Sequence, residues 1–136
     1  GVDKILNLHD IALPEETVGT ALVFDTLEHV EYPRKAMEEI YRILKPEGFV
    51  VISSHMNFPI HNHPNDYWRF TPEGFKSLLK PFPVSFAECA GDENFPHTII
   101  GVGLKNPNTD ISKLINEIKL WKNGKLYLNQ DETKIN

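Results

Sequence analysis

The sequence of 136 residues has one cysteine, no long apolar run and no cluster of basic residues. The single cysteine, Cys89, excludes an intrachain disulfide, and its place in an apolar stretch predicts a buried core thiol. No run approaches the roughly 20 apolar residues that cross a bilayer, and no signal-peptide pattern opens the chain. A net charge of −5 argues against a surface that holds nucleic-acid backbone. These absences predict one globular cytoplasmic domain with no membrane partner and no indicated nucleic-acid partner.

The stretch 20–54 has the pattern of a strand, a helix and a second strand. Residues 20–24 and 49–53 are short apolar runs without polar alternation, which is typical of central strands in a parallel sheet. Pro33 suits the first position of the helix, because its missing N–H costs nothing there. Residues 45–48, Lys-Pro-Glu-Gly, are predicted to end the helix in a tight turn. The residues at helical spacing that we expect to be buried are Ala36, Met37, Ile40, Tyr41 and Leu44.

The other elements are predicted from the same kinds of signal. They are strands at 2–8, 84–90 and 98–104 and helices at 72–82 and 111–121. The loop between the last two strands is short enough for an antiparallel hairpin. Thr71 and Asp110 stand where each helix begins and are predicted N-caps, because their side-chain oxygens can accept hydrogen bonds from the first free N–H groups.

Three ionisable residues follow the strand at 20–24 directly and are not needed for folding: Asp25, Glu28 and His29. In open α/β sheets ligands bind at that carboxyl edge, so these residues are predicted to lie in a site. Histidine titrates near neutral pH, and His29 could take a proton from an acceptor hydroxyl or amine. The alternative is that His29 only forms a hydrogen bond with a backbone carbonyl of the loop.

The stretch 55–71 is dense in histidine, proline and aromatic residues. The prolines exclude a helix, so we expect an ordered loop that acts as a lid or substrate wall. In the alternative, Trp68 and Phe70 fill the core and Asp66 pairs with Arg69. Both arrangements can hold for different residues of the loop.

Metal binding in this loop is a further reading, because His61 and His63 with Asp66 resemble a ligand cluster. No cysteine lies nearby, and a third ligand must come from a distance. The sequence therefore favours no metal, and a small metalloprotein remains a third hypothesis.

Four segments in order resemble the second half of a class I S-adenosylmethionine-dependent methyltransferase of the type 11 kind. They are residues 10–14, 27–30, 39–52 and 61–79. The resemblance implies a Rossmann-like α/β sheet, incomplete at its amino end, with an antiparallel carboxyl-terminal strand pair. It implies a partial methyltransferase domain at 1–105, followed by a helix and tail at 106–136. Glu47 departs from the family, which has glycine there, and favours a type I turn over type II.

The resemblance implies S-adenosylmethionine as cofactor and an unidentified methyl acceptor. In the family, an acid at the position of Asp10 accepts a hydrogen bond from the adenine amino group, and the next N–H, that of Ile11, meets a ring nitrogen; an Asx-turn is the alternative for Asp10. The implied cofactor residues are Asp10, Ile11, Asp25, Leu27 and Glu28. Those implied on the acceptor side are His61, Asp66 and Trp68, with His29, Tyr67 and Arg69 as catalytic residues.

The glycine-rich loop that holds the methionine part of the cofactor in this family has no counterpart in the sequence. Gly101-Val102-Gly103 precedes no predicted helix and fails as a fingerprint. We therefore expect a carboxyl half that is inactive by itself, with a non-catalytic interaction or regulatory module as the rival function. The missing neighbour strand would leave a bare edge, which predicts a homo-oligomer through the amino-terminal strands. The polar tail containing Leu126, Tyr127 and Leu128 is expected to be partly disordered or to pair with another chain.

Overall fold

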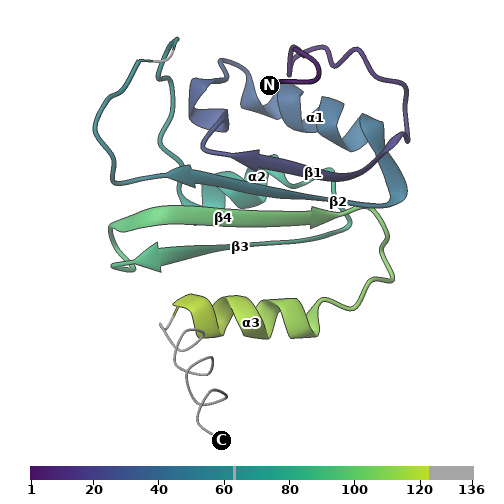
Figure 1. The fold of residues 1–136 in the computed structure, drawn as a ribbon. Coiled ribbons are helices and arrows are strands. Elements are labelled where there is room, and N and C mark those ends of the chain that lie inside the picture. The colour runs from purple at the N-terminus through teal and green to yellow at the C-terminus, as the bar shows by residue number, and fades with distance from the viewer. Residues whose placement is uncertain (63, 123–136) are drawn as a thin grey trace, which may run out of the picture.

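The computed structural model describes residues 1–62 and 64–122. It contains one four-stranded sheet with the strand order β1-β2-β4-β3 (Figure 1). The strands are β1 (Val18–Phe24), β2 (Leu44–His55), β3 (Val84–Gly91) and β4 (Pro96–Leu104). The helices are the 3-10 turn η1 (Leu27–His29), α1 (Pro33–Ile43), α2 (Pro72–Leu78) and α3 (Ser112–Lys122). The predictions for His63 and for the tail at 126–128 lie outside the described residues.

The predicted strand-helix-strand unit is confirmed. β1 pairs parallel with β2, so that Thr20 to Phe24 lie beside Phe49 to Ser53. α1 begins at Pro33 and carries the buried stripe that the spacing predicts, with Met37 and Ile40 at most 2% exposed. The two strands end at the same edge of the sheet, and this edge receives η1 and the loop after β2.

The chain folds back on itself at 45–48 as predicted, but these residues lie inside β2 instead of between the helix and the strand. β2 begins at Leu44, directly after α1, and residues 45–48 form an irregularity inside the strand, because Val18 pairs with Leu44 whereas Thr20 pairs with Phe49. Glu47 has no positive φ, so a type II arrangement is absent as expected. Gly48 is required for another reason: a Cβ there would lie 2.9 Å from the carbonyl oxygen of Lys45.

The antiparallel hairpin of β3 and β4 is confirmed, and Cys89 is buried in β3. α2 ends at Leu78, earlier than predicted, although Phe82 remains buried. The cap predicted at Thr71 is present, whereas Asp110 lies one residue before the N-cap position of α3. The Thr71 side chain accepts a hydrogen bond from the Gly74 N–H at 3.0 Å, and the Asp110 carboxylate accepts one from the Ser112 N–H at 2.9 Å.

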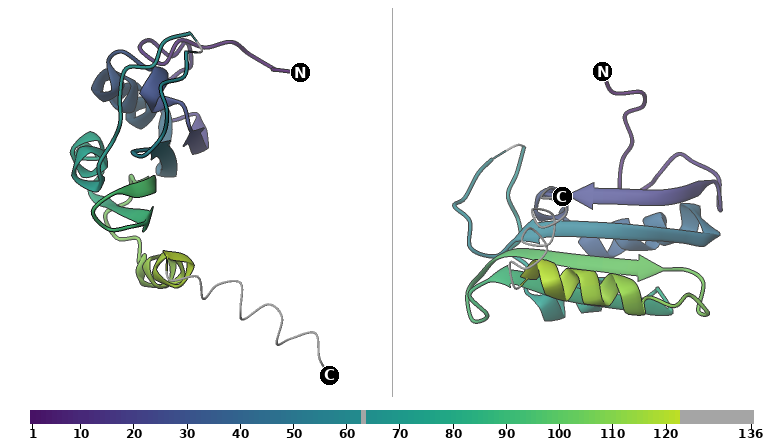
Figure 2. Two further views of the ribbon diagram at one scale, coloured as in Figure 1. Left: turned by 90° about the vertical axis from the view of Figure 1, so that its left-hand side faces the viewer. Right: turned by 60° about the horizontal axis from the view of Figure 1, so that its bottom comes forward.

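The two faces of the sheet are covered unequally. α1 and α2 lie on one face and α3 on the other, over β3 and β4 (Figure 2). The core therefore lies mainly between the sheet and the first two helices. On the α3 side, β1 stays open, and its residues Leu22 and Phe24 are 61% and 51% exposed.

The strand predicted at 2–8 is wrong. Val2 and Ile5 are 82% and 93% exposed, and the segment forms only an isolated bridge between Asn7 and Asp10. A strand needs a neighbour for its backbone groups, and no described strand lies beside this segment. The chain instead follows α1, where Glu39 and Arg42 supply hydrogen-bond partners to the backbone of residues 11–13.

None of the helices within residues 1–62 and 64–122 is both long and apolar enough to cross a membrane.

Candidate functional site

Asp25 opens the candidate site at the carboxyl end of β1. Its backbone has a φ of 45°, a left-handed conformation that Asp tolerates better than most residues, and its N–H donates to the carbonyl of Ser53 at 3.0 Å. The carboxylate lies 3.4 Å from the Nε2 atom of His55 and is about half exposed. A charged acceptor therefore faces solvent at the edge where β1 and β2 end together, as the sequence predicts for Asp25.

Glu28 is the most buried charged residue of the site, with 1% of its surface exposed. Its Oε2 atom accepts a hydrogen bond from the Ser54 hydroxyl at 2.7 Å, whereas Oε1 has no hydrogen-bond partner among the described residues. Its backbone carbonyl accepts from the N–H of Tyr67 at 2.8 Å and more weakly from that of Trp68 at 3.3 Å. Glu28 thus joins η1 to β2 and to the loop after β2.

His29 and His61 meet at this position although 32 residues separate them. Their Nε2 atoms are 3.1 Å apart, and their rings are perpendicular with centroids 4.7 Å apart. The Nδ1 atom of His29 is 2.5 Å from the carbonyl oxygen of Asn65, so the predicted alternative for His29, a bond to a loop carbonyl, is present. The proton-transfer role is a separate property of Nε2 and stays a prediction.

Arg69 and Asp66 form a bidentate ion pair inside the loop, with nitrogen-oxygen distances of 2.5 and 2.7 Å. The other N–H groups of Arg69 donate to the carbonyls of Phe58, Pro59 and Trp68. All five donors are used, which leaves none for a methyl acceptor. The hydrogen bonds from Arg69 and then from the His61 N–H hold the pKa of Asp66 well below its usual range. The pairing offered as the alternative is therefore present, and the roles of Arg69 and Asp66 at the acceptor stay predictions.

Tyr67 and Trp68 remain accessible, at 42% and 43% exposure. With Phe58, Ile60 and the Asp66–Arg69 pair they line a hollow of about 310 Å³. The Trp68 indole N–H donates to the carbonyl of Val30 at 3.0 Å, which fixes the ring across the end of η1. The loop therefore presents an aromatic wall, consistent with the predicted substrate wall, while Phe70 fills the core as the alternative for that residue predicts.

The other residues implied as cofactor contacts have mixed surroundings. Asp10 is exposed and follows His9, whose Nε2 accepts from the Tyr32 N–H at 3.2 Å near the start of α1. Ile11 is buried, and its N–H already donates to Glu39 at 2.8 Å. Leu27 is fully buried, so its side chain belongs to the core. The cofactor contacts of all three stay predictions.

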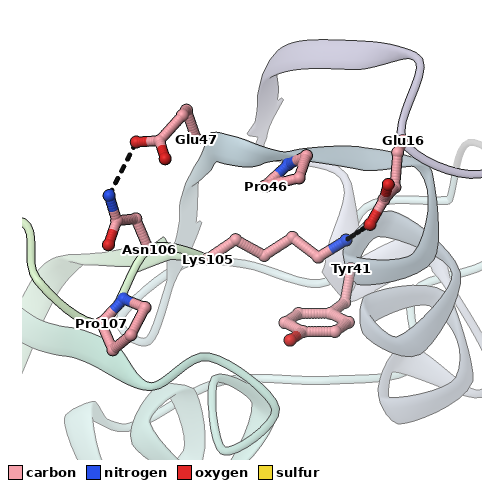
Figure 3. A pocket seen from close by; sticks show the side chains of 7 residues that line it. All are labelled: Glu16, Tyr41, Pro46, Glu47, Lys105, Asn106 and Pro107. Carbon is pink, nitrogen blue, oxygen red and sulfur yellow. Dashed lines mark hydrogen bonds and ion pairs between the residues drawn. The ribbon is translucent and has the colours of Figure 1, made fainter.

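A second hollow, of about 300 Å³, lies at the opposite edge, where β2 begins and β4 ends (Figure 3). Lys105 crosses it, donating to the carbonyl of Leu44 at 2.7 Å, and lies 4.6 Å from the centre of the Tyr41 ring. Asn106 donates to Glu47 at 2.7 Å. Because these polar groups already form hydrogen bonds, we assign the hollow a structural role in joining β2 to β4 at this edge.

Sequence reasoning missed Ser54 and His55 as site residues. They are the last residues of β2, and the parallel pairing with β1 places them beside Glu28 and Asp25. The signal was available, because two parallel strands that end together bring their terminal residues to one edge.

Comparison with known proteins agrees with this fold. Residues 4–52 match the family model described as a methyltransferase domain. No curated protein sequence matches the chain significantly. The resemblance to class I methyltransferases that the sequence suggests is therefore confirmed in residues 4–52. The likeness of the fold reaches beyond this range.

Three solved structures illustrate the fold. A methyltransferase of Thermotoga maritima, described as a possible histamine N-methyltransferase, is similar with a TM-score of 0.58 and 17% identity over 73% of this chain and 61% of its own. A methyltransferase of Archaeoglobus fulgidus gives 0.57 and 15% over 69% and 62%. A protein of Pyrococcus horikoshii gives 0.54 and 14% over 72% and 56%. The chain thus has a Rossmann-like methyltransferase fold and spans about 60% of the length of the structures it matches.

Proposed function

We propose that the edge formed by Asp25 and Glu28 binds S-adenosylmethionine and that the protein transfers its methyl group to an unidentified acceptor. The observation that carries the proposal is the exposed carboxylate of Asp25 at the carboxyl end of β1, where the Asp25 backbone N–H donates to the carbonyl of Ser53. The cofactor supplies a methyl group bound to a positively charged sulfur. An exposed carboxylate, with the buried carboxylate of Glu28 behind it, suits a ligand that carries an ammonium and a sulfonium group.

Asp10 fits the adenine end of the cofactor by the chemistry of its carboxylate, which only accepts hydrogen bonds and so selects an amino group over a carbonyl. The proposed contact from the Ile11 N–H to adenine competes with Glu39, which holds that N–H at 2.8 Å. We therefore assign adenine recognition mainly to Asp10.

The acceptor side of the proposed site is the aromatic wall of Tyr67 and Trp68, next to His29. A carbonyl oxygen beside Nδ1 of His29 requires the proton on that nitrogen, which leaves the lone pair on Nε2. Nε2 can then accept a proton from an acceptor hydroxyl or amine. The Nε2 atom of His61 lies 3.1 Å from Nε2 of His29 and limits access to that atom from one side.

The test is a titration of isotope-labelled protein with S-adenosylhomocysteine, followed by backbone amide shifts. We expect shifts at residues 10–11 and 25–29, and we expect Asp25→Asn to weaken them. Glu47→Gln, at the opposite edge, is the control and should leave them unchanged. Shifts gathered around Lys105, or none at millimolar ligand, would contradict the proposal.

The rival function is a non-catalytic interaction module, and the outer edge of β1 is the observation that favours it. Among the residues that the structure describes, no strand pairs with this edge, and Leu22 and Phe24 are exposed beside it. Such an edge promotes pairing with another chain. We propose a homodimer through β1, without the segment 2–8, which forms no strand.

Light scattering on Phe24→Glu and on Ile60→Glu tests the dimer. Ile60 is 84% exposed in the loop and serves as the control. We expect a dimer for the unchanged chain and for Ile60→Glu, and a monomer for Phe24→Glu. A monomeric unchanged chain with an ordered amino-terminal segment would contradict the edge argument.

The cytoplasmic location and the division at residue 105 stay predictions.

A further inference from the structure

Glu28, His29 and His61 bring three ligand-type atoms to one point, within 4.8 Å of one another. The Glu28 Oε1 atom lies 4.0 Å from His29 Nε2, and the two histidine Nε2 atoms are 3.1 Å apart. The set comes from η1 and from the loop after β2. The loop thus closes over the end of β1.

The protonation of the two histidines leaves a position between them that needs a cation. The Nδ1 atom of His29 faces the Asn65 carbonyl, and that of His61 faces the Pro59 carbonyl at 3.1 Å and the Asp66 carboxylate at 3.3 Å. These partners only accept hydrogen bonds, so each Nδ1 carries a proton. The two Nε2 atoms lie 3.1 Å apart, and their lone pairs repel each other unless a proton or a metal ion lies between them.

The unpaired oxygen of Glu28 points to the same conclusion independently. Oε1 belongs to a side chain with 1% exposure and has no hydrogen-bond partner within residues 1–62 and 64–122. A buried carboxylate oxygen without a partner is costly. A metal ion next to Nε2 of His29 would satisfy this oxygen and both lone pairs at once.

The geometry and chemistry of the set suit a metal of the zinc type. Bonds of about 2.0–2.1 Å at a tetrahedral angle place two nitrogens about 3.3 Å apart, close to the observed separation. Two imidazoles and one carboxylate, with a fourth position open, match the pattern of catalytic rather than structural zinc sites. Each ligand also has an orienting partner, since Ser54 holds Oε2 of Glu28 and carbonyls hold both histidines.

We propose that Glu28 Oε1, His29 Nε2 and His61 Nε2 bind one divalent transition-metal ion such as Zn²⁺. This site replaces the ligand set of His61, His63 and Asp66, because both oxygens of Asp66 are paired with Arg69. Asp25 and His55 form a second group with Glu28, but they already pair with each other at 3.4 Å. The inference concerns ion binding alone. In the ion-bound chain, Glu28 Oε1 and His29 Nε2 are metal ligands, so His29 Nε2 does not serve there as the proton acceptor proposed above.

Calorimetric titration with zinc chloride tests the site, together with the visible spectrum after addition of cobalt chloride. We expect one ion per chain, and a loss of affinity of about 10-fold or more in Glu28→Gln and in His61→Asn. His97→Ala, an exposed histidine elsewhere, is the matched control and should bind as the unchanged chain does. His63→Ala should also bind normally.

Circular dichroism and the melting temperature show whether each variant is folded. Should His61→Asn unfold, Glu28→Gln keeps the test decisive, because it preserves the size of the side chain. The proposal is overturned if micromolar zinc does not bind, since a shared proton then joins the histidines. It is equally overturned if Glu28→Gln binds zinc normally or if His63→Ala abolishes binding.

Discussion

Glu39 holds the segment before β1 against α1 through its charge. Its carboxylate accepts from Arg42 at 2.8 and 2.9 Å and from the Ile11 N–H at 2.8 Å. The hydrogen bond from Arg42 and then that from Ile11 lower the pKa of Glu39 from 4.5 to about 2. A lowered pKa in the folded state stabilises the protein fully above pH 4.5, and this contribution is lost as the pH falls toward 2.

We expect Glu39→Gln to lower the melting temperature at pH 7 by about 4 °C or more. The difference from the unchanged chain should shrink as the pH falls below 4.5, because the unchanged carboxyl group also becomes neutral. Thermal melts across this range measure both effects. Glu38→Gln, at an exposed position on the same helix, should change little; an equal loss in both variants would refute the role of Glu39.

Arg69 holds the loop after β2 by five hydrogen bonds. In Arg69→Ala the Asp66 side chain, only 2% exposed, loses its charge partner, so we expect the melting temperature to fall by about 5 °C or more. Arg69→Lys should recover little, since an ammonium cannot form the bidentate pair. Arg34→Ala removes an exposed arginine that donates hydrogen bonds to Ser77 and is the control. Unchanged melting of Arg69→Ala combined with reduced turnover would return Arg69 to a direct role at the acceptor.

At the scale of elements, two glycines of β4 allow the residues that follow α2 to pack closely on the sheet. A Cβ at Gly103 would lie 2.6 Å from the Phe82 ring, and one at Gly101 would lie 2.9 Å from Ile52 and from Leu79. The pair that fails as a glycine-rich fingerprint therefore serves close packing of the helix on the sheet.

We expect Gly103→Ala to cost about 1–3 kcal/mol of unfolding free energy, because the added methyl group overpacks the core. Urea unfolding measures it. Gly19→Ala on β1 is the matched control, since a Cβ there has no atom within 4 Å. A Gly103→Ala variant as stable as Gly19→Ala would show that Phe82 moves aside freely.

At the scale of the whole molecule, the 136 residues contain no glycine-rich cofactor loop. Much of the proposed contact with S-adenosylmethionine is therefore missing from this chain, and we expect weak binding or none in calorimetric titration. Micromolar affinity would show that the carboxyl edge suffices by itself. The amide shifts proposed above at millimolar ligand separate weak binding at the right edge from no binding.

The sequence by itself determined the elements whose signals are local. The apolar runs at 20–24 and 49–53, the start of α1 at Pro33 and the cap at Thr71 each depend on residues within a few positions of one another. The hairpin of β3 and β4 followed in the same way from a short connection. Because these signals are local, they are sufficient to predict the elements without knowledge of the rest of the fold.

Features that depend on distant partners follow from the tertiary structure and not from the local sequence. Residues 2–8 form no strand because no described neighbour pairs with their backbone, and 45–48 become part of β2 because Lys105 and Val18 hold both ends of the irregularity. Arg69 turns into the loop, and His61 reaches His29 across 32 residues. A side chain's direction depends on the path of the loop that carries it, and that path is set by long-range packing and hydrogen bonding rather than by local spacing.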